Sequence, residues 1–277
     1  MSFDSIERST ATGRPVELYE FRYGSAKDAV YRYTNADKDI TDGGVVYKAI
    51  PIRRETYKSS GKTDKTTMSI KVPENADISQ LFTAYPPTQP VTVIMRAGHL
   101  SDGQKQYLAV WSGRVLSTAK NGNETELTCE NTLVSLKRPG LRANWQYGCR
   151  HVLYGDGCKA DQIKATRNTT VAEITTDGTI VLPHNWNAGT DFSYFNGGML
   201  RWSAPNGTEY RTIRKCTETG LAFNGPLRGL EVGMDIAVIL GCNHKTDQCL
   251  AVHDNILNYG GQPWIPLKNP AKHHPFW

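Results

Sequence analysis

The sequence predicts a mainly β protein, with an antiparallel β domain followed by a small cysteine-rich domain that contains further β segments. Short segments rich in β-branched and aromatic residues recur along the 277 residues, which is typical of strands. Turn signals containing Gly, Asn or Asp separate these segments. Four of the six cysteines fall into two pairs in the second half of the chain.

The first half of the chain contains the clearest strand signals. Turns are expected at Asp42-Gly43-Gly44, Asp102-Gly103 and Asn121-Gly122, the last two in hairpins. One short helix is expected at Ile78–Thr83, with Asp77 as its N-cap. The expected strands are residues 16–23, 29–35, 45–50, 66–72, 91–96, 106–116 and 124–130. Together they predict an antiparallel β domain that ends near residue 140.

The composition changes after Lys137-Arg138-Pro139-Gly140, where glycine, aromatic and cysteine residues become frequent. A second group of β segments follows, with hairpins expected around Asp177-Gly178 and Asn206-Gly207. Its apolar residues predict a small core of its own: Val171, Ile174, Ile180, Leu200, Trp202, Tyr210 and Ile213.

Composition and charge exclude several classes of protein. Hydrophobic residues make up 39% of the chain and charged residues 21%, a balance typical of globular proteins. No apolar run is long enough for a membrane span, and the polar N-terminus predicts no signal peptide. The net charge of +5 is mild, and no run of Lys and Arg predicts a nucleic-acid site.

The cysteine pairs are the strongest functional signal. Cys149 and Cys158 are separated by eight residues, and Cys242 and Cys249 by six. Thiolates from two loops suit zinc or an iron–sulfur cluster, and cytosolic proteins rarely hold such cysteines as disulfides. Zinc ribbons usually place two residues between paired cysteines, so this spacing makes zinc the weaker choice. Glycines beside the pairs, such as Gly148 and Gly241, allow close wrapping of backbone around a cofactor.

The remaining cysteines and the nearby histidines have lesser expected roles. Cys129 shares a strand face with Leu127 and is expected in the core, whereas Cys216 is assigned no role. The histidines are expected at most to support the ligands from behind: His151, His244 and His253. Gly260 and Gly261 are expected to form a tight turn against the cysteine loops.

Several motifs together resemble the iron–sulfur tail-tip, or baseplate, hub proteins of long-tailed phages and gene transfer agents. They are the paired cysteine spacing, the Gly241-Cys242 pair, and the sequences NYGGQPWIP, YRYTNADKDIT, VVYKAIPI and SIKVP. The resemblance implies a β-rich hub domain at residues 1–140 and an iron–sulfur domain at 141–277. It also implies a [4Fe-4S] cluster on four ligands: Cys149, Cys158, Cys242 and Cys249.

The resemblance further implies a structural virion protein without enzymatic activity. Such a protein is made in the bacterial host cytoplasm and assembled at the tail tip. It would connect the distal tail ring to the central hub or fibre protein, as a homotrimer, without binding specific nucleic acid or spanning a membrane. One departure is an insert at about residues 165–238, which lambda-type members of the family lack and gene-transfer-agent members share.

Two other functions are compatible with the residues themselves. One is a zinc-stabilised adaptor module, which would use the same cysteines. The other is a tail-associated cysteine peptidase with Cys149 or Cys158 as nucleophile. His151 is a poor general base for Cys149 on an extended strand, because residues two apart share a face but lie several ångströms from each other. The metal content of protein purified without air distinguishes these possibilities.

Overall fold

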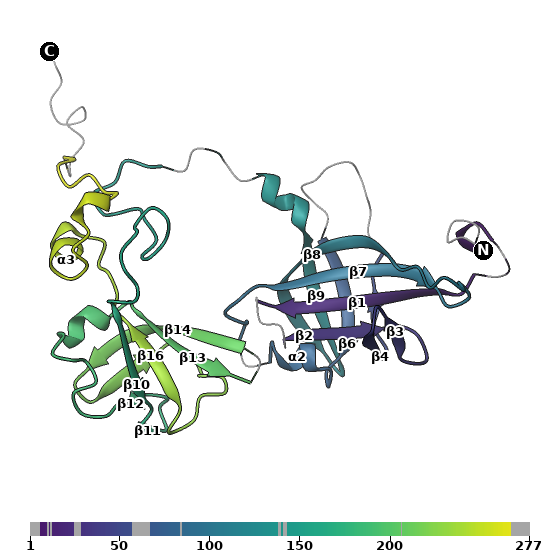
Figure 1. Ribbon diagram of the computed structural model, residues 1–277, viewed down its shortest axis with the longest axis horizontal. Coiled ribbons are helices and arrows are strands. Elements are labelled where there is room, and N and C mark those ends of the chain that lie inside the picture. Colours follow the sequence, from purple (N-terminus) through teal and green to yellow (C-terminus); the bar gives the residue numbers. More distant parts are fainter. Residues whose placement is uncertain are drawn as a thin grey trace, which may run out of the picture. The chain divides into compact units, whose positions relative to one another are not determined.

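The computed structural model describes residues 6–9, 11, 13–24, 29–56, 67–83, 85–137, 140, 143–205 and 207–266 (Figure 1). The chain divides into two compact units, which comprise residues 1–138 and most of residues 139–277. Each unit contains one sheet, and nearly all strand pairs are antiparallel, so the predicted mainly β class is confirmed. Within the described residues, no helix has the length and apolar character needed to cross a membrane.

The first unit is built on a nine-stranded sheet. Neighbouring strands in this sheet pair antiparallel, apart from β2 and β4, which run parallel. Gly122 lies in the turn of the β8–β9 hairpin and has a φ of 61°. A 3₁₀ helix, η1 (Thr132–Lys137), follows the sheet. Across the sheet the strands are β3 (Ile40–Asp42), β4 (Val45–Ala49), β2 (Val30–Thr34), β1 (Pro15–Tyr23), β7 (Val91–His99), β8 (Leu108–Asn121), β9 (Glu124–Asn131), β6 (Thr67–Pro73) and β5 (Arg53–Arg54).

The core of this unit follows from the period-two pattern of its strands. In β6, every second residue is buried, and Ile70 lies opposite the fully buried Leu127 of β9. Cys129 is also fully buried in this core, as its strand face predicts. Strand β1 buries both faces, because Phe21 packs into the main core while Leu18 packs into a second, smaller cluster.

The helix predicted at Ile78–Thr83 is shorter than expected and is capped differently. It is α2 (Asp77–Gln80), and its N-cap is Ala76, so the prediction that Asp77 caps it is wrong. Tertiary contacts replace a side-chain cap. The backbone N–H of Ile78 donates to the Tyr33 hydroxyl at 3.3 Å, and the Ser79 hydroxyl donates to the carbonyl oxygen of Pro73 at 2.9 Å.

The second unit is built on a seven-stranded sheet. Its helical elements are η2 (Phe192–Phe195), α3 (Thr246–Ala251) and η3 (Ile256–Asn258). Gly178 turns the β11–β12 hairpin with a φ of 79°, at the predicted position. Across the sheet the strands are β10 (Thr166–Thr170), β16 (Asp235–Ile239), β13 (Met199–Ala204), β14 (Gly207–Thr217), β15 (Gly220–Phe223), β12 (Ile180–Val181) and β11 (Glu173–Ile174).

Most of the apolar residues predicted for the second core do lie in it, with one exception. Tyr210 lies outside the core cluster and lines a groove instead. Strands β10 and β16, from the two ends of the predicted insert, pair with each other, with Thr166 opposite Ile239. Tyr154 and Val252, which flank the cysteines in sequence, pack against the same core, so the sheet and the cysteine-bearing chain share one core.

Candidate metal centre

The four paired cysteines line one pocket of the second unit, although they come from distant parts of the chain. They lie in two stretches, residues 143–165 and 240–266, which we call the cysteine segments. Cys149 and Cys158 precede β10, Cys242 follows β16, and Cys249 lies in α3. The cavity between them has a volume of about 20 Å³. It is therefore larger than the ~10–15 Å³ that a single water molecule needs.

Backbone hydrogen bonds bring the two cysteine segments together. The N–H of Cys149 donates to the carbonyl oxygen of His244 at 2.8 Å, and the N–H of Gln262 donates to that of Gln146 at 2.9 Å. The Tyr259 hydroxyl lies 3.2 Å from the same His244 carbonyl oxygen. These contacts align the first cysteine pair with the chain around the second.

Three of the four sulfur atoms accept hydrogen bonds from N–H groups. Gly260 N donates to Cys149 Sγ at 3.2 Å, and His244 N donates to Cys242 Sγ at 3.3 Å. The side-chain amide of Asn255 donates to Cys158 Sγ at 3.5 Å. Hydrogen bonds of this kind stabilise the negative charge of metal-bound thiolates and tune iron–sulfur clusters.

The surroundings of Cys242 and Cys249 disfavour the thiolate form of these side chains when no cation is near. Burial raises the pKa of both Cys242 and Cys249, and the proximity of the other pocket cysteines raises it further. For Cys242, the hydrogen bond from His244 N acts in the opposite direction. Four crowded thiolates would repel one another, so the fully deprotonated set requires a bound cation or cationic cluster.

Close backbone approach explains the two glycines after the second cysteine pair. A Cβ on Gly261 would lie 2.6 Å from the carbonyl carbon of Gly148, and one on Gly260 would lie 2.6 Å from the His151 ring. Neither glycine has a positive φ. The expected tight approach to the cysteine segments is therefore present, but it depends on missing side-chain volume and not on an unusual φ.

Contacts with η2 and the residue after it hold Gly241, and so position the adjacent Cys242. The N–H of Gly241 donates to the Tyr194 carbonyl oxygen in η2 at 2.8 Å, and a Cβ on Gly241 would lie 2.2 Å from the carbonyl oxygen of Asn196. Two residues after Cys242, His244 has a φ of 60°, which is uncommon for a residue with a side chain. The surrounding packing enforces a strained turn here, as is common at binding sites.

Two of the predicted supporting histidines bind backbone carbonyls and not sulfur. His151 Nδ1 donates to the carbonyl oxygen of Asn258 at 3.0 Å. His253 Nε2 donates to that of Gly241 at 2.9 Å, and its ring packs edge-on against Tyr154. His244 contributes its backbone N–H and carbonyl oxygen. All three histidines line the pocket.

Sequence reasoning missed two polar residues that organise the pocket. Besides its contact with sulfur, the Asn255 amide donates to the carbonyl oxygen of Cys158. Gln248 is only 8% exposed, and both ends of its side-chain amide are hydrogen-bonded. It accepts from Asn243 N at 2.8 Å and donates to the Gly241 carbonyl oxygen at 3.2 Å. The only sequence signal was their position, since Gln248 precedes Cys249 directly and Asn255 follows it by six residues.

The other two cysteines lie outside the pocket. Burial raises the pKa of Cys129 to about 12, and burial together with Asp191 raises that of Cys216 to about 12. All six cysteines are free thiols. Across the part of the chain that the structure describes, no group of three or more His, Cys, Asp or Glu side chains is arranged to hold a metal ion. The four paired cysteines nevertheless line one common space.

Comparisons with known proteins relate both halves of the chain to phage proteins. Residues 193–269 match a family described as phage conserved hypothetical protein BR0599. A protein of Xylella fastidiosa (strain 9a5c) is 27% identical over 171 residues, which cover 57% of this chain. The chain spans only 35% of that relative's length.

A chain in the solved virion of a native gene transfer agent particle has a similar fold. Its TM-score is 0.83 at 14% sequence identity, over 99% of this chain and 95% of that one. Residues 19–161, about half of the sequence, match the family model described as baseplate hub protein, N-terminal attachment domain. The chain therefore belongs to this family of baseplate hub proteins.

Proposed function

We propose that this baseplate hub protein is a structural component of the phage tail tip, fastened by a [4Fe-4S] cluster on Cys149, Cys158, Cys242 and Cys249. One observation carries the assignment of the cluster. Thiols from two distant segments line one small pocket, and three of their sulfur atoms receive N–H hydrogen bonds. Four thiolates are the usual ligands of a [4Fe-4S] cluster.

The spacing of the cysteines along the chain favours a polynuclear cluster over zinc, because zinc ribbons usually place two residues between paired cysteines. One zinc ion draws its sulfur ligands to ~2.3 Å from a single point. The four cysteines line a shared cavity of the second unit. In a [4Fe-4S] cluster each cysteine binds a different iron, so its ligand sulfurs stand farther apart.

When bound, the cluster would supply four metal–sulfur bonds that join the two cysteine segments. The chain's own residues prepare the site for it. Backbone N–H groups of His244 and Gly260 point at sulfur, and Asn255 holds both the sulfur and the carbonyl oxygen of Cys158. Lys245 also lines the pocket, and its positive charge would offset the negative charge of the thiolate-ligated centre.

The proposed place in the virion is between the distal tail ring and the central hub or fibre protein, as a homotrimer. Membership of a baseplate hub family and the fold shared with a gene transfer agent virion chain support a role in the virion tail. On this proposal the chain is a structural element and catalyses no reaction, so the cysteines act only as ligands.

The metal content of the full chain tests the cluster. Protein purified without exposure to air is expected to be brown and to contain iron and acid-labile sulfide in equal amounts. A Cys149→Ser variant is expected to lose both. Cys216→Ala is the matched control, since Cys216 lies in the same unit but outside the pocket, and it is expected to retain them. Stoichiometric zinc without iron or sulfide would instead support the adaptor module.

The location requires a separate test. Imaging of assembled tails is expected to show this chain at the tip, in three copies between the distal ring and the central protein. Tails that contain the chain elsewhere, or in another copy number, would contradict the proposed placement without affecting the metal assignment.

A further inference from the structure

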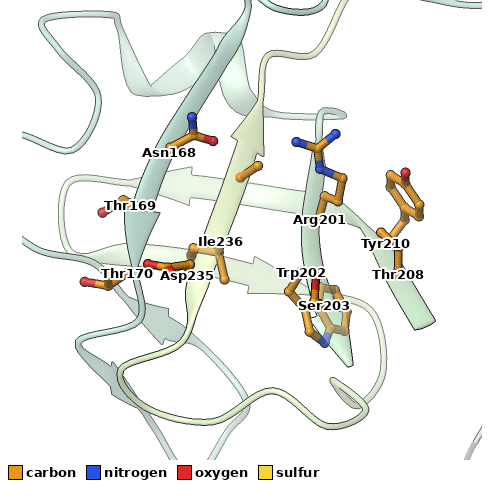
Figure 2. A pocket seen from close by; sticks show the side chains of 11 residues that line it. Asn168, Thr169, Thr170, Arg201, Trp202, Ser203, Thr208, Tyr210, Asp235 and Ile236 are labelled. Carbon is orange, nitrogen blue, oxygen red and sulfur yellow. The ribbon is translucent and has the colours of Figure 1, made fainter. Parts of the chain in front are cut away.

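A second concave site lies on the sheet of the second unit, away from the cysteines. Figure 2 shows this groove, which crosses strands β10, β16, β13 and β14 and has a volume of about 660 Å³. Pockets of this size suit small ligands or a few residues of a polymer. Its floor is the side of the sheet opposite the core, since Ile236, Trp202 and Val238 point into the core and the alternate residues do not.

The strand register explains why a groove forms at this position. Ala237 lies in the centre of the row, opposite Asn168 on one side and Arg201 on the other. The small side chain of Ala237 leaves a depression in this face of the sheet, and the larger side chains of Asn168 and Arg201 flank it. One pair further along the strands, Asp235 lies opposite Thr170. Tyr210 projects from β14, the strand next to that of Arg201 (Figure 2).

Three polar side chains of the groove are available to hydrogen-bond a ligand. Among the described residues, the side chains of Asn168, Arg201 and Asp235 form no hydrogen bond or ion pair with protein groups. Asn168 and Asp235 are exposed, and Arg201 and Tyr210 are partly exposed. An amide, a guanidinium and a carboxylate therefore face the same space with their hydrogen-bonding capacity available.

The chemistry of this lining fits a sugar better than other ligand classes. One arginine and one aspartate give no net charge, whereas nucleic-acid sites need clustered Lys and Arg. Exposed large apolar side chains, which anchor most protein interfaces, are absent among its described lining residues apart from the Tyr210 ring. A protein site for a hydroxyl-rich sugar offers planar donors and acceptors to the sugar's hydroxyl groups and an aromatic ring to its apolar face.

We propose that this groove binds a neutral glycan, with Asn168, Arg201 and Asp235 hydrogen-bonding its hydroxyl groups and Tyr210 packing against a sugar ring. The site is independent of the cysteine pocket and stands whether or not a cluster is present. In a tail protein, such a site would give the tip an affinity for sugars of the cell surface.

Binding of the full chain to an array of neutral and anionic bacterial surface oligosaccharides tests the proposal, with affinities then measured by calorimetry for the best neutral glycan. Arg201→Ala and Asp235→Ala are each expected to weaken binding at least tenfold, and Tyr210→Ala to abolish it. Neither Arg201 nor Asp235 supports a protein contact, so these variants are expected to keep the wild-type melting temperature. Arg214→Ala is the matched control, because it removes an exposed arginine of β14 that does not line the groove.

Three results would overturn the proposal. They are no binding of any neutral glycan by the wild-type chain, equal binding by wild type and the folded Arg201→Ala and Asp235→Ala variants, and binding restricted to nucleic acid or to anionic glycans. Nuclear magnetic resonance shifts confined to β10, β13, β14 and β16 on addition of the glycan would support it. Shifts elsewhere in the chain would place the sugar at another site and refute the assignment of this groove.

Discussion

The nine-stranded sheet buries Phe21, Leu18 and Leu127 completely, whereas in the cysteine segments Leu257 is 97% and Trp145 82% exposed. The sheet is stabilised by apolar surface that strand alternation directs inward. The cysteine segments contain only the six-residue helix α3 and one 3₁₀ turn, and they are joined by hydrogen bonds across the pocket. Segments with so little apolar burial need another source of stability, which a metal cluster on four cysteines can supply.

The largest expected effect is that of removing the proposed cluster. Cys158→Ser, or prolonged chelation of the wild type, is expected to leave residues 143–165 and 240–266 largely unfolded, because structural metal sites contribute ~10–16 kcal/mol in zinc peptides. Hydrogen exchange should show loss of protection there while β1, β7 and β9 remain protected. Equal loss of protection in those strands would mean that the two regions are not independently stabilised.

A truncation in the core of the nine-stranded sheet should destabilise the first unit and leave the cysteine segments unaffected. Leu127→Ala removes a fully buried side chain and is expected to cost about 2–5 kcal/mol through lost burial and a residual cavity. The melting temperature of the first unit should fall while the iron content per folded chain stays unchanged. A drop in iron content would show that the core of the first unit supports the cysteine pocket.

The glycine contact between the cysteine segments should have an intermediate effect. Gly261→Ala places a methyl group 2.6 Å from the Gly148 carbonyl carbon and is expected to cost about 1–3 kcal/mol through forced displacement. Loss of iron on dilution into chelator should become faster. Gly103→Ala is the control, since its Cβ would meet nothing within 4 Å, and it should behave like wild type. Unchanged iron release in Gly261→Ala would exclude a tight contact.

The Asn255 amide should affect the reduction potential of the proposed cluster more than the stability of the chain. Asn255→Ala removes the donor to Cys158 Sγ and is expected to cost ~1–2 kcal/mol of stability. Because the lost hydrogen bond favours the more negative reduced state, the reduction potential should fall by tens of millivolts, on the order expected for one such bond. Asn258→Ala tests specificity, since the Asn258 amide donates to Asn255 and not to sulfur. An equal fall in both variants would argue against a direct N–H···S contribution.

The smallest expected effect is the alkaline response of Cys129. Burial raises its pKa to about 12 in the folded chain, whereas an exposed thiol titrates near ~8.5. The folded state therefore retains the proton that the unfolded state loses, so stability present below pH ~8.5 declines as the pH rises toward 12. Cys129→Ala should flatten this decline in alkaline melting curves of the first unit. An unchanged slope would mean that Cys129 does not titrate with unfolding.

Local sequence patterns were sufficient to identify the mainly β class, most strands, the core position of Cys129, and the cysteines that the structure brings to one pocket. These features depend on alternation and residue type, which act over a few residues. The capping of α2 was mispredicted, because Tyr33, more than forty residues away, provides the contact at its start. The wrong core assignment of Tyr210 has a similar origin, since its direction depends on strand register.

Only the tertiary structure decided which groups surround the sulfur atoms and which face of the second sheet is open. The roles of Asn255 and Gln248, and the steric need for Gly261, arise from segments that meet only after folding. The groove around Ala237 likewise depends on three strands whose order along the chain differs from their order in the sheet. Residue type and spacing determine which donors the chain can offer, whereas packing between distant segments determines what those donors face.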